Sequence, residues 1–262
     1  MVHGSDHARR RSTSAPGRAA WWVVASAILL SSCANQADTR KADAHYKMGY
    51  SYLIEQQLQP AYVEFQKAAE LNPKDRDTRY ALGHIYFLQG NYPKAEREFQ
   101  RVIKLDPRYA EAWNYLGKTY DEQGKTDLAL QNFDRALSLP QYLTPDLAQY
   151  NKGKVYLKRK QPDQALLAFL AALRINPSHA LAAFEAGRIY EDQGAVREAV
   201  AAFEMAAKQL PDFAEAHYYL AKAYVRAGKT DQAQEAYRRV VDLAPGSPWA
   251  EDASSYLARL RK

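Results

Sequence analysis

The sequence has a single cysteine and six histidines among its 262 residues. No pair of these residues has the spacing of zinc ligands, and a lone cysteine leaves no internal disulfide to expect. The chain also lacks a glycine-rich phosphate loop and a nucleophile elbow. We therefore expect no catalytic site, no metal, no cofactor and no small-molecule substrate, so the protein is not predicted to be an enzyme.

The excess of positive over negative charge is also small. The formal net charge is +6, and half of this excess comes from four arginines against one aspartate in residues 1–32. The remaining excess is modest and dispersed, with no lysine and arginine stripe interleaved with aromatic residues. Nucleic acid is therefore not an expected partner.

The sequence has no hydrophobic run of the length that a membrane span needs. Its longest run lies near the N-terminus. Residues 19–30 are apolar and follow a basic segment, which is typical of the hydrophobic region of a secretory signal and short for a membrane span. The only cysteine, Cys33, comes directly after Leu30, Ser31 and Ser32. This order resembles the bacterial lipobox, whose cysteine is lipidated and becomes the new N-terminus.

The lipobox resemblance implies a signal peptide over residues 1–32 and a tether over residues 33–41. An alternative is that Cys33 is an incidental thiol beside an uncleaved anchor. More than one acyl chain holds a protein stably on a membrane. Ala34 follows the cysteine where inner-membrane lipoproteins of many bacteria have aspartate, so we expect a lipid anchor on the periplasmic face of the outer membrane.

What the chain does have is a repeat. Residues 113–133 read W-x2-L-G-x2-Y followed by A-x3-F, which is the pattern of the 34-residue tetratricopeptide repeat. Aligned copies begin at Ala42, Arg76, Ala110, Asp146, Ala180 and Ala214. Position eleven is tyrosine and position twenty is alanine in all six copies. Position eight is glycine in five copies and Ala221 in the last, and position twenty-four is phenylalanine in five copies and Tyr237 in the last.

These columns have packing reasons. Small residues at positions eight and twenty let two antiparallel helices approach closely, and the aromatic residues fill the space beside that contact. Proline at position thirty-two ends the second helix of five copies. An unrelated amphipathic bundle would not keep these offsets. The sequence predicts an all-α, right-handed superhelical solenoid of six tetratricopeptide repeats over residues 42–247, arranged as one stack.

Two segments depart from the period. Residues 139–145 contain two residues more than the repeat allows, and their prolines predict a short exposed loop that carries Tyr142 and Leu143. This loop is either a neutral insertion or a partner contact. After the sixth repeat, Ser247 can cap a helix over residues 248–262 that opens with Pro248. We interpret it as the capping helix that covers the last repeat, with docking to a partner as the alternative.

Resemblance to tetratricopeptide arrays implies that positions five, nine and twelve of the first helices line a concave groove. The predicted groove residues are Tyr46, Tyr50, Tyr80, His84, Phe87, Asn114, Lys118, Tyr150, Lys154, Phe184, Arg188, Tyr218 and Lys222. An aromatic row with flanking cations suits a peptide that carries acidic groups. The alternative is that the tyrosines pack between adjacent first helices and expose only a rim.

The whole layout resembles a known family. Six repeats, a lipobox and the segment from Ala136 to Ala148 are similar to the type IV pilus biogenesis pilotins, of the PilF, PilW and Tgl type, in which a related L-Y-x-T-P-A joint occurs. The resemblance implies an outer-membrane lipoprotein that binds secretin subunits and promotes assembly of their ring. An alternative from another class is a lipid-anchored adaptor for peptidoglycan hydrolases or for an envelope export machine.

Overall fold

The computed structural model describes the backbone of residues 18–260 and the side chains of residues 36–260. The described part is all helical, in agreement with the predicted class. Its helices are α1 (Arg18–Ile54), α2 (Leu58–Leu71), α3 (Arg76–Leu88), α4 (Tyr92–Leu105), α5 (Ala110–Glu122), α6 (Thr126–Leu137), α7 (Pro145–Lys158), α8 (Pro162–Ile175), α9 (Ala180–Asp192), α10 (Val196–Gln209), α11 (Ala214–Arg226), α12 (Thr230–Leu243) and α13 (Pro248–Arg259).

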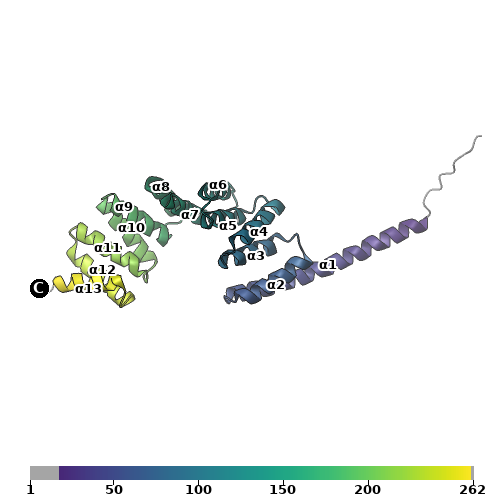
Figure 1. The fold of residues 1–262 in the computed structure, drawn as a ribbon, viewed down its shortest axis with the longest axis horizontal. Coiled ribbons are helices and arrows are strands. Elements are labelled where there is room, and N and C mark those ends of the chain that lie inside the picture. Colours follow the sequence, from purple (N-terminus) through teal and green to yellow (C-terminus); the bar gives the residue numbers. More distant parts are fainter. Residues whose placement is uncertain (1–17, 261–262) are drawn as a thin grey trace, which may run out of the picture. The chain divides into compact units, whose positions relative to one another are not determined.

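The helices pair as the repeat alignment predicts, with an odd-numbered first helix and an even-numbered second helix in each repeat (Figure 1). The chain divides into two compact units between Thr78 and Arg79, where we expected one stack. A solenoid can divide in this way because each repeat contacts only its neighbours. The first unit holds the first repeat, and the second holds repeats two to six from Arg79 on.

The core of each of the first five repeats is one phenylalanine that packs against one glycine. Five phenylalanines, at position twenty-four of repeats one to five, are fully buried. A Cβ atom added at Gly83, Gly117 or Gly187 would lie less than 3.0 Å from the ring of the phenylalanine in the same repeat. The lack of a side chain at position eight therefore lets the ring contact the helix backbone, as the pattern predicts.

A residue with positive φ joins the two helices of each repeat. Four repeats use glycine there, with φ between 70° and 74° at Gly90, Gly124, Gly194 and Gly228. The first and fourth repeats have Gln56 and Lys160 instead, at φ of 60° and 58°. Side chains other than glycine pay a steric cost in this region of backbone conformation, so these two turns are the strained ones.

The N-terminal segment differs from the predicted tether. Residues 33–41 are helical and continue α1 into the first repeat. Their short polar sequence is compatible with a helix, and Lys41 Nζ lies 3.9 Å from Asp38 Oδ1 one turn earlier. Residues 1–17 of the predicted signal peptide and the side chain of Cys33 lie outside the described residues. Among the described helices, none combines the length and the apolar character needed to cross a membrane.

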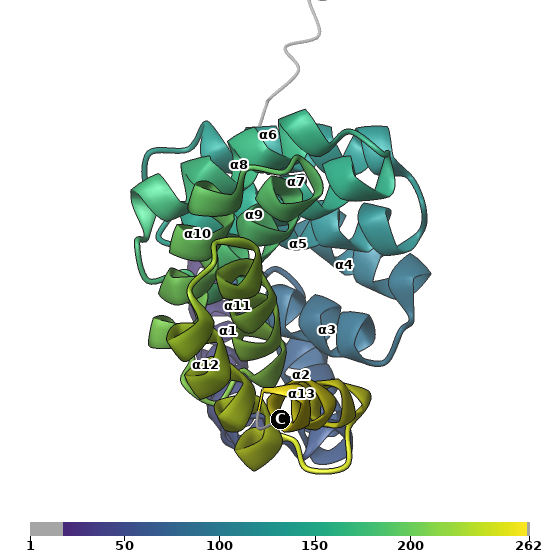
Figure 2. The same cartoon turned by 90° about the vertical axis from the view of Figure 1, so that its left-hand side faces the viewer.

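The C-terminal helix covers the last repeat, as predicted. Ser247 accepts a hydrogen bond from the backbone N–H of Ala250 at 3.1 Å and so caps α13. On its inner side Ala253 is buried, and the ring of Tyr256 lies 4.7 Å from that of Tyr237 on α12. Figure 2 shows α13 packed beside α12 at this end of the second unit. The apolar face of the sixth repeat is thereby removed from water.

Candidate functional site: the face of the first helices

Five repeats have an aromatic ring at position five, and four of these rings are half-buried while Phe184 is buried. Each packs against the aromatic residue at position twenty-four of its own repeat, with centroids 5.6 to 6.1 Å apart. Burial raises the pKa of Tyr150 to about 12 and raises that of Tyr80 as well. The packing alternative is therefore correct for one side of each ring, and whether the other side of the four tyrosine rings binds a partner stays a prediction.

Tyr115 organises an aromatic cluster between the second and third repeats. Its ring lies 5.7 Å from Tyr80, 5.0 Å from His84 and 5.9 Å from Phe87, centroid to centroid. Its hydroxyl is 3.2 Å from Nε2 of His84. Burial in this cluster, and then the charge of Lys118, lower the pKa of His84 below its ordinary value. His84 is therefore a neutral packing residue at pH 7.

A second cluster repeats this arrangement between the fifth and sixth repeats. The ring of Tyr219 lies 5.6 Å from Phe184 and 5.7 Å from Phe203. Arg188 and Lys222 lie over the face of the Tyr219 ring, 5.5 Å and 5.1 Å from its centroid. In the first cluster Lys118 Nζ lies 4.3 Å from the Tyr115 ring centroid, so the two clusters combine rings and cations in the same way, within the unit that begins at Arg79.

Tyr115 and Tyr219 were missed by the sequence reasoning, because both occupy position six and the prediction considered only positions five, nine and twelve. A signal was present. In both first helices the residue directly after position five is aromatic, as in the pair Tyr218 and Tyr219. Position six faces the first helix of the preceding repeat, which explains the contacts of both tyrosines with that repeat.

Two predicted groove residues are in fact buried. Phe184 is 4% exposed because Tyr219 and Phe213 cover it, and Asn114 is 5% exposed because Asn151 of the next repeat hydrogen bonds to it at 3.2 Å. Neither can offer a partner much contact area, so assigning them to the groove surface was wrong. Both instead join neighbouring first helices.

The other predicted groove residues keep some exposure. In the first unit, the rings of Tyr46 and Tyr50 stack with centroids 6.4 Å apart, and Tyr50 is 52% exposed. In the second unit, Lys154 is exposed 6.0 Å from the Tyr150 centroid. Tyr218 donates a hydrogen bond to Asp252 of α13 at 2.8 Å, so the hydroxyl of Tyr218 already has a partner in the capping helix.

The joint after the third repeat was predicted to expose two residues, and only one of them is exposed. Leu143 is 86% exposed, as predicted, whereas Tyr142 is only 7% exposed. The loop folds back toward the start of the third repeat, with Gln141 Nε2 donating at 3.2 Å to the carbonyl of Arg108, which lies just before α5. The Tyr142 ring joins the core cluster of the third repeat, and burial raises its pKa to about 12. It is a packing residue and not a partner contact.

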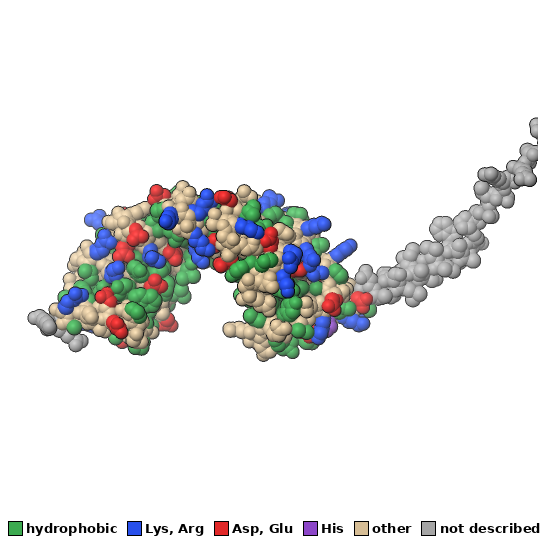
Figure 3. All heavy atoms as spheres, in the orientation of Figure 1, with side chains coloured by type: hydrophobic (Ala, Val, Ile, Leu, Met, Phe, Trp, Pro, Cys, Tyr) green, Lys and Arg blue, Asp and Glu red, His purple; other side chains and the backbone are tan. Residues whose placement is uncertain are grey.

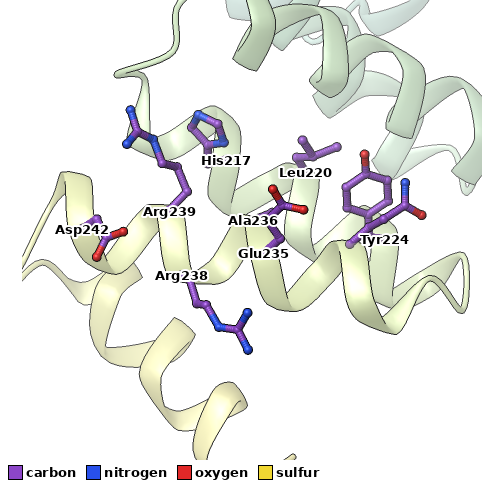
Figure 4. Close-up of a pocket in the computed structure, with 9 residues that line it drawn as sticks. His217, Leu220, Tyr224, Glu235, Ala236, Arg238, Arg239 and Asp242 are labelled. Carbon is purple, nitrogen blue, oxygen red and sulfur yellow. The ribbon is translucent and has the colours of Figure 1, made fainter.

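A pocket of about 480 Å³ lies between α11 and α12 (Figure 4). His217 occupies the position that Trp113 fills in the third repeat. The two side chains make equivalent contacts: Trp113 Nε1 donates to the carbonyl of Pro107, and His217 Nε2 lies against the carbonyl of Pro211, both at 3.0 Å. The imidazole of His217, which lines this pocket, is smaller than the indole of Trp113 and fills less of the space between the two helices.

Replacing His217 with tryptophan should fill this pocket. The indole can keep the hydrogen bond to Pro211, and Arg239 can lie over its face as Arg135 lies 5.8 Å from the centroid of Trp113. We expect the unfolding free energy of the last repeats to rise by about 1 kcal/mol, measured by urea denaturation. His217→Ala is the matched control and should lower it. A less stable tryptophan variant would show that the pocket cannot admit the ring.

Other site types find little support in the described part of the chain. Residues 36–260 contain no group of three or more histidine, aspartate and glutamate side chains placed to hold a metal ion. Acidic and basic side chains are interspersed on the face of the second unit shown in Figure 3. The features that remain are the two clusters of rings and cations.

A stack of helix pairs whose first helices carry aromatic and basic side chains defines a protein-interaction scaffold. Sequence profiles of the tetratricopeptide repeat match residues 46–101, 80–146 and 150–212, and a second such profile matches residues 190–260. The chain belongs to the tetratricopeptide-repeat family. This fold is typically a non-enzymatic interaction domain. Comparison with curated proteins gave no match.

Solved structures with this fold include two proteins of type IV pilus biogenesis. PilF of Pseudomonas aeruginosa is 23% identical, with a TM-score of 0.74 over 84% of this chain and 99% of PilF. PilW, a widely conserved type IV pilus biogenesis factor, is 21% identical, with a TM-score of 0.69 over 84% and 98%. YrrB, a repeat protein with an unusual peptide-binding site, is 24% identical with a TM-score of 0.55 over 73% and 97%. These likenesses establish the shared fold.

Proposed function

We propose that this protein is an outer-membrane lipoprotein that binds secretin subunits and promotes assembly of the secretin ring in type IV pilus biogenesis. The observation that carries the proposal is the fold likeness to PilF and PilW, which spans nearly the full length of both proteins. The lipobox-like segment before Cys33 and the proline-bounded joint over residues 139–145 support it from the sequence.

The physical requirements of this role match the features of the chain. An assembly factor must hold another protein, and the clusters around Tyr115 and Tyr219 present rings and cations suited to a peptide segment. It must also stay at the membrane where the ring forms. Diacylglycerol on Cys33, with a further acyl chain on its amino group, would hold it there stably.

Co-purification tests the secretin part of the proposal. A tagged copy of the protein, solubilised in mild detergent from its own cells, should recover secretin, and deletion of the gene should leave secretin monomers in place of detergent-resistant multimers. Normal multimers in the deletion strain would overturn the role. Recovery of peptidoglycan hydrolases without secretin would favour the adaptor alternative.

Cys33→Ala tests the anchor. The variant should remain a full-length precursor, should incorporate no labelled palmitate and should leave the outer-membrane fraction, because no thiol remains to carry diacylglycerol. Ser32→Ala is the matched control, since it changes the neighbouring residue and keeps the thiol, and it should behave like the wild type. Size, labelling and fractionation of Cys33→Ala equal to the wild type would remove the lipid anchor from the proposal.

A further inference from the structure

The contact between α5 and α7 has an unbalanced charge at its centre. Two attractive contacts join these first helices of the third and fourth repeats. Asn151 Nδ2 donates to Asn114 Oδ1 at 3.2 Å, and two turns further along Lys158 Nζ lies 2.8 Å from Asp121 Oδ2. The two contacts leave between them one level of the helix pair, about one turn away from each.

That middle level holds two lysines. Lys118 follows Asn114 by four residues and Lys154 follows Asn151 by three, so each stands one turn above the amide pair on the same face of its helix. The two side chains therefore stand at the same level of the α5–α7 contact, and repulsion from Lys154 is the main charge effect that lowers the pKa of Lys118, after burial itself. The attractive contacts on either side hold together two like charges.

Neither lysine has an ion pair in the described part of the chain, unlike other lysines on the first helices. Lys152 Nζ lies 2.5 Å from Asp134 Oδ1, and Lys222 Nζ lies 3.6 Å from Glu191 Oε1. Nearby acidic groups are Glu122, one turn after Lys118, and Glu185 on α9, but neither lies within ion-pair distance of these lysines. Lys118 is half-buried without a counter-ion, which is costly, so an external anion would gain by binding beside it and the exposed Lys154.

Aromatic rings lie beside both lysines. Lys118 Nζ lies 4.3 Å from the ring centroid of Tyr115 and 4.7 Å from that of Phe87, and Lys154 Nζ lies 6.0 Å from that of Tyr150. Rings of this kind accept an apolar side chain adjacent to the anion. The lysines stand in mid-helix, away from the free backbone N–H groups of a helix N-terminus that suit phosphate. A carboxylate fits this setting better than a phosphate does.

We infer that Lys118 and Lys154 together bind a carboxylate of a partner protein, in a segment where an aspartate or glutamate stands next to an aromatic or aliphatic residue. This inference deepens the proposed function and rests on it for the assumption that this face binds a protein. It assigns the chemistry of the bound segment and places its charged anchor at the joint between the third and fourth repeats.

Selection from a random-peptide phage library tests the inference without knowledge of the partner. The wild-type protein should enrich peptides with an acidic residue beside an apolar one. A synthetic copy of the selected peptide should bind Lys118→Gln and Lys154→Gln each about tenfold more weakly, measured by fluorescence anisotropy. Replacing its acidic residue by the amide should cause a similar loss. Lys118→Arg keeps the charge and should keep most of the affinity.

Lys152→Gln is the matched control, because it removes the same charge from α7 at a lysine already paired with Asp134. It should bind like the wild type. Selection without acidic enrichment, or equal binding by the lysine variants, would overturn the inference. The inference would also be overturned if the lysine variants kept their binding to the peptide and instead lost binding to phosphatidylglycerol vesicles. If the variants no longer bind the peptide but still recover secretin, the proposed function stands and this face is not where secretin binds.

Discussion

Replacing Gly153 with valine is expected to unfold the middle of the second unit. A Cβ atom at this position would lie 2.7 Å from both Cδ1 and Cζ of Phe169, a ring that is fully buried. Valine adds two further carbons on the same side. The ring has no free space into which it can move, so we expect a loss of about 3 kcal/mol in unfolding free energy, measured by urea denaturation.

Two controls separate this steric effect from the loss of a glycine. Gly124→Ala changes a turn glycine with φ of 74° and nothing within 4 Å of an added Cβ, so only backbone strain of about 1 kcal/mol should appear. Combining Gly153→Val with Phe169→Leu should recover part of the lost stability, because the smaller side chain makes room. A double variant with the summed loss of the two single variants would contradict the proposed clash.

The repeat architecture could be predicted because its signals are local and occur six times. A glycine or alanine at position eight and an aromatic residue at position twenty-four together specify how two helices touch within one repeat. The predicted pairs, their joint after the third repeat and the capping helix with Ser247 at its start all appear in the structure. No contact between distant parts of the chain was needed for these predictions.

The candidate site was less predictable because it depends on contacts between repeats. Position five was expected to face a partner, yet at Phe184 the neighbouring Tyr219 closes that side, and at Asn114 the neighbouring Asn151 does the same. The residue at position six of the next repeat therefore contributes to the burial of position five. That position varies among lysine, alanine, tyrosine, asparagine and glutamate along the chain, so the family pattern does not reveal the exposed surface.

Tyr142 shows the same limit at the joint. Its proline neighbours correctly indicate a loop, and loops usually lie at the surface. However, the two extra residues allow the chain to turn back, so that Gln141 bonds to the carbonyl of Arg108 and Tyr142 enters the core. Leu143, the next residue, points the other way and is exposed. The alternation within this loop follows from its tertiary contacts and not from its composition.

Replacing Tyr115 with alanine is expected to open the cluster between the second and third repeats. The tyrosine ring contacts Tyr80, His84, Phe87 and Phe99, and its removal leaves a cavity among them. We expect a loss of about 3 kcal/mol in unfolding free energy, measured by urea denaturation. Tyr115→Phe is the matched control, because it keeps the ring and loses only the contact between the hydroxyl and His84.

The same variant should change the titration of His84. Burial is the main cause of its lowered pKa, so water admitted by Tyr115→Ala should raise that pKa toward the ordinary value, as measured by NMR of the imidazole protons. In the wild type the unfolded state binds the proton more readily than the folded state, so stability falls as the pH is lowered from about 6.5, the ordinary value, toward the folded-state pKa of His84.

Tyr115→Ala should weaken that pH dependence, and Tyr115→Phe should largely preserve it. Because Lys118 also rests on the Tyr115 ring, 4.3 Å from its centroid, the alanine variant should bind the selected acidic peptide less well than the phenylalanine variant does. An unchanged unfolding free energy together with an unchanged His84 pKa would mean that Tyr115 is a surface residue and does not organise this face.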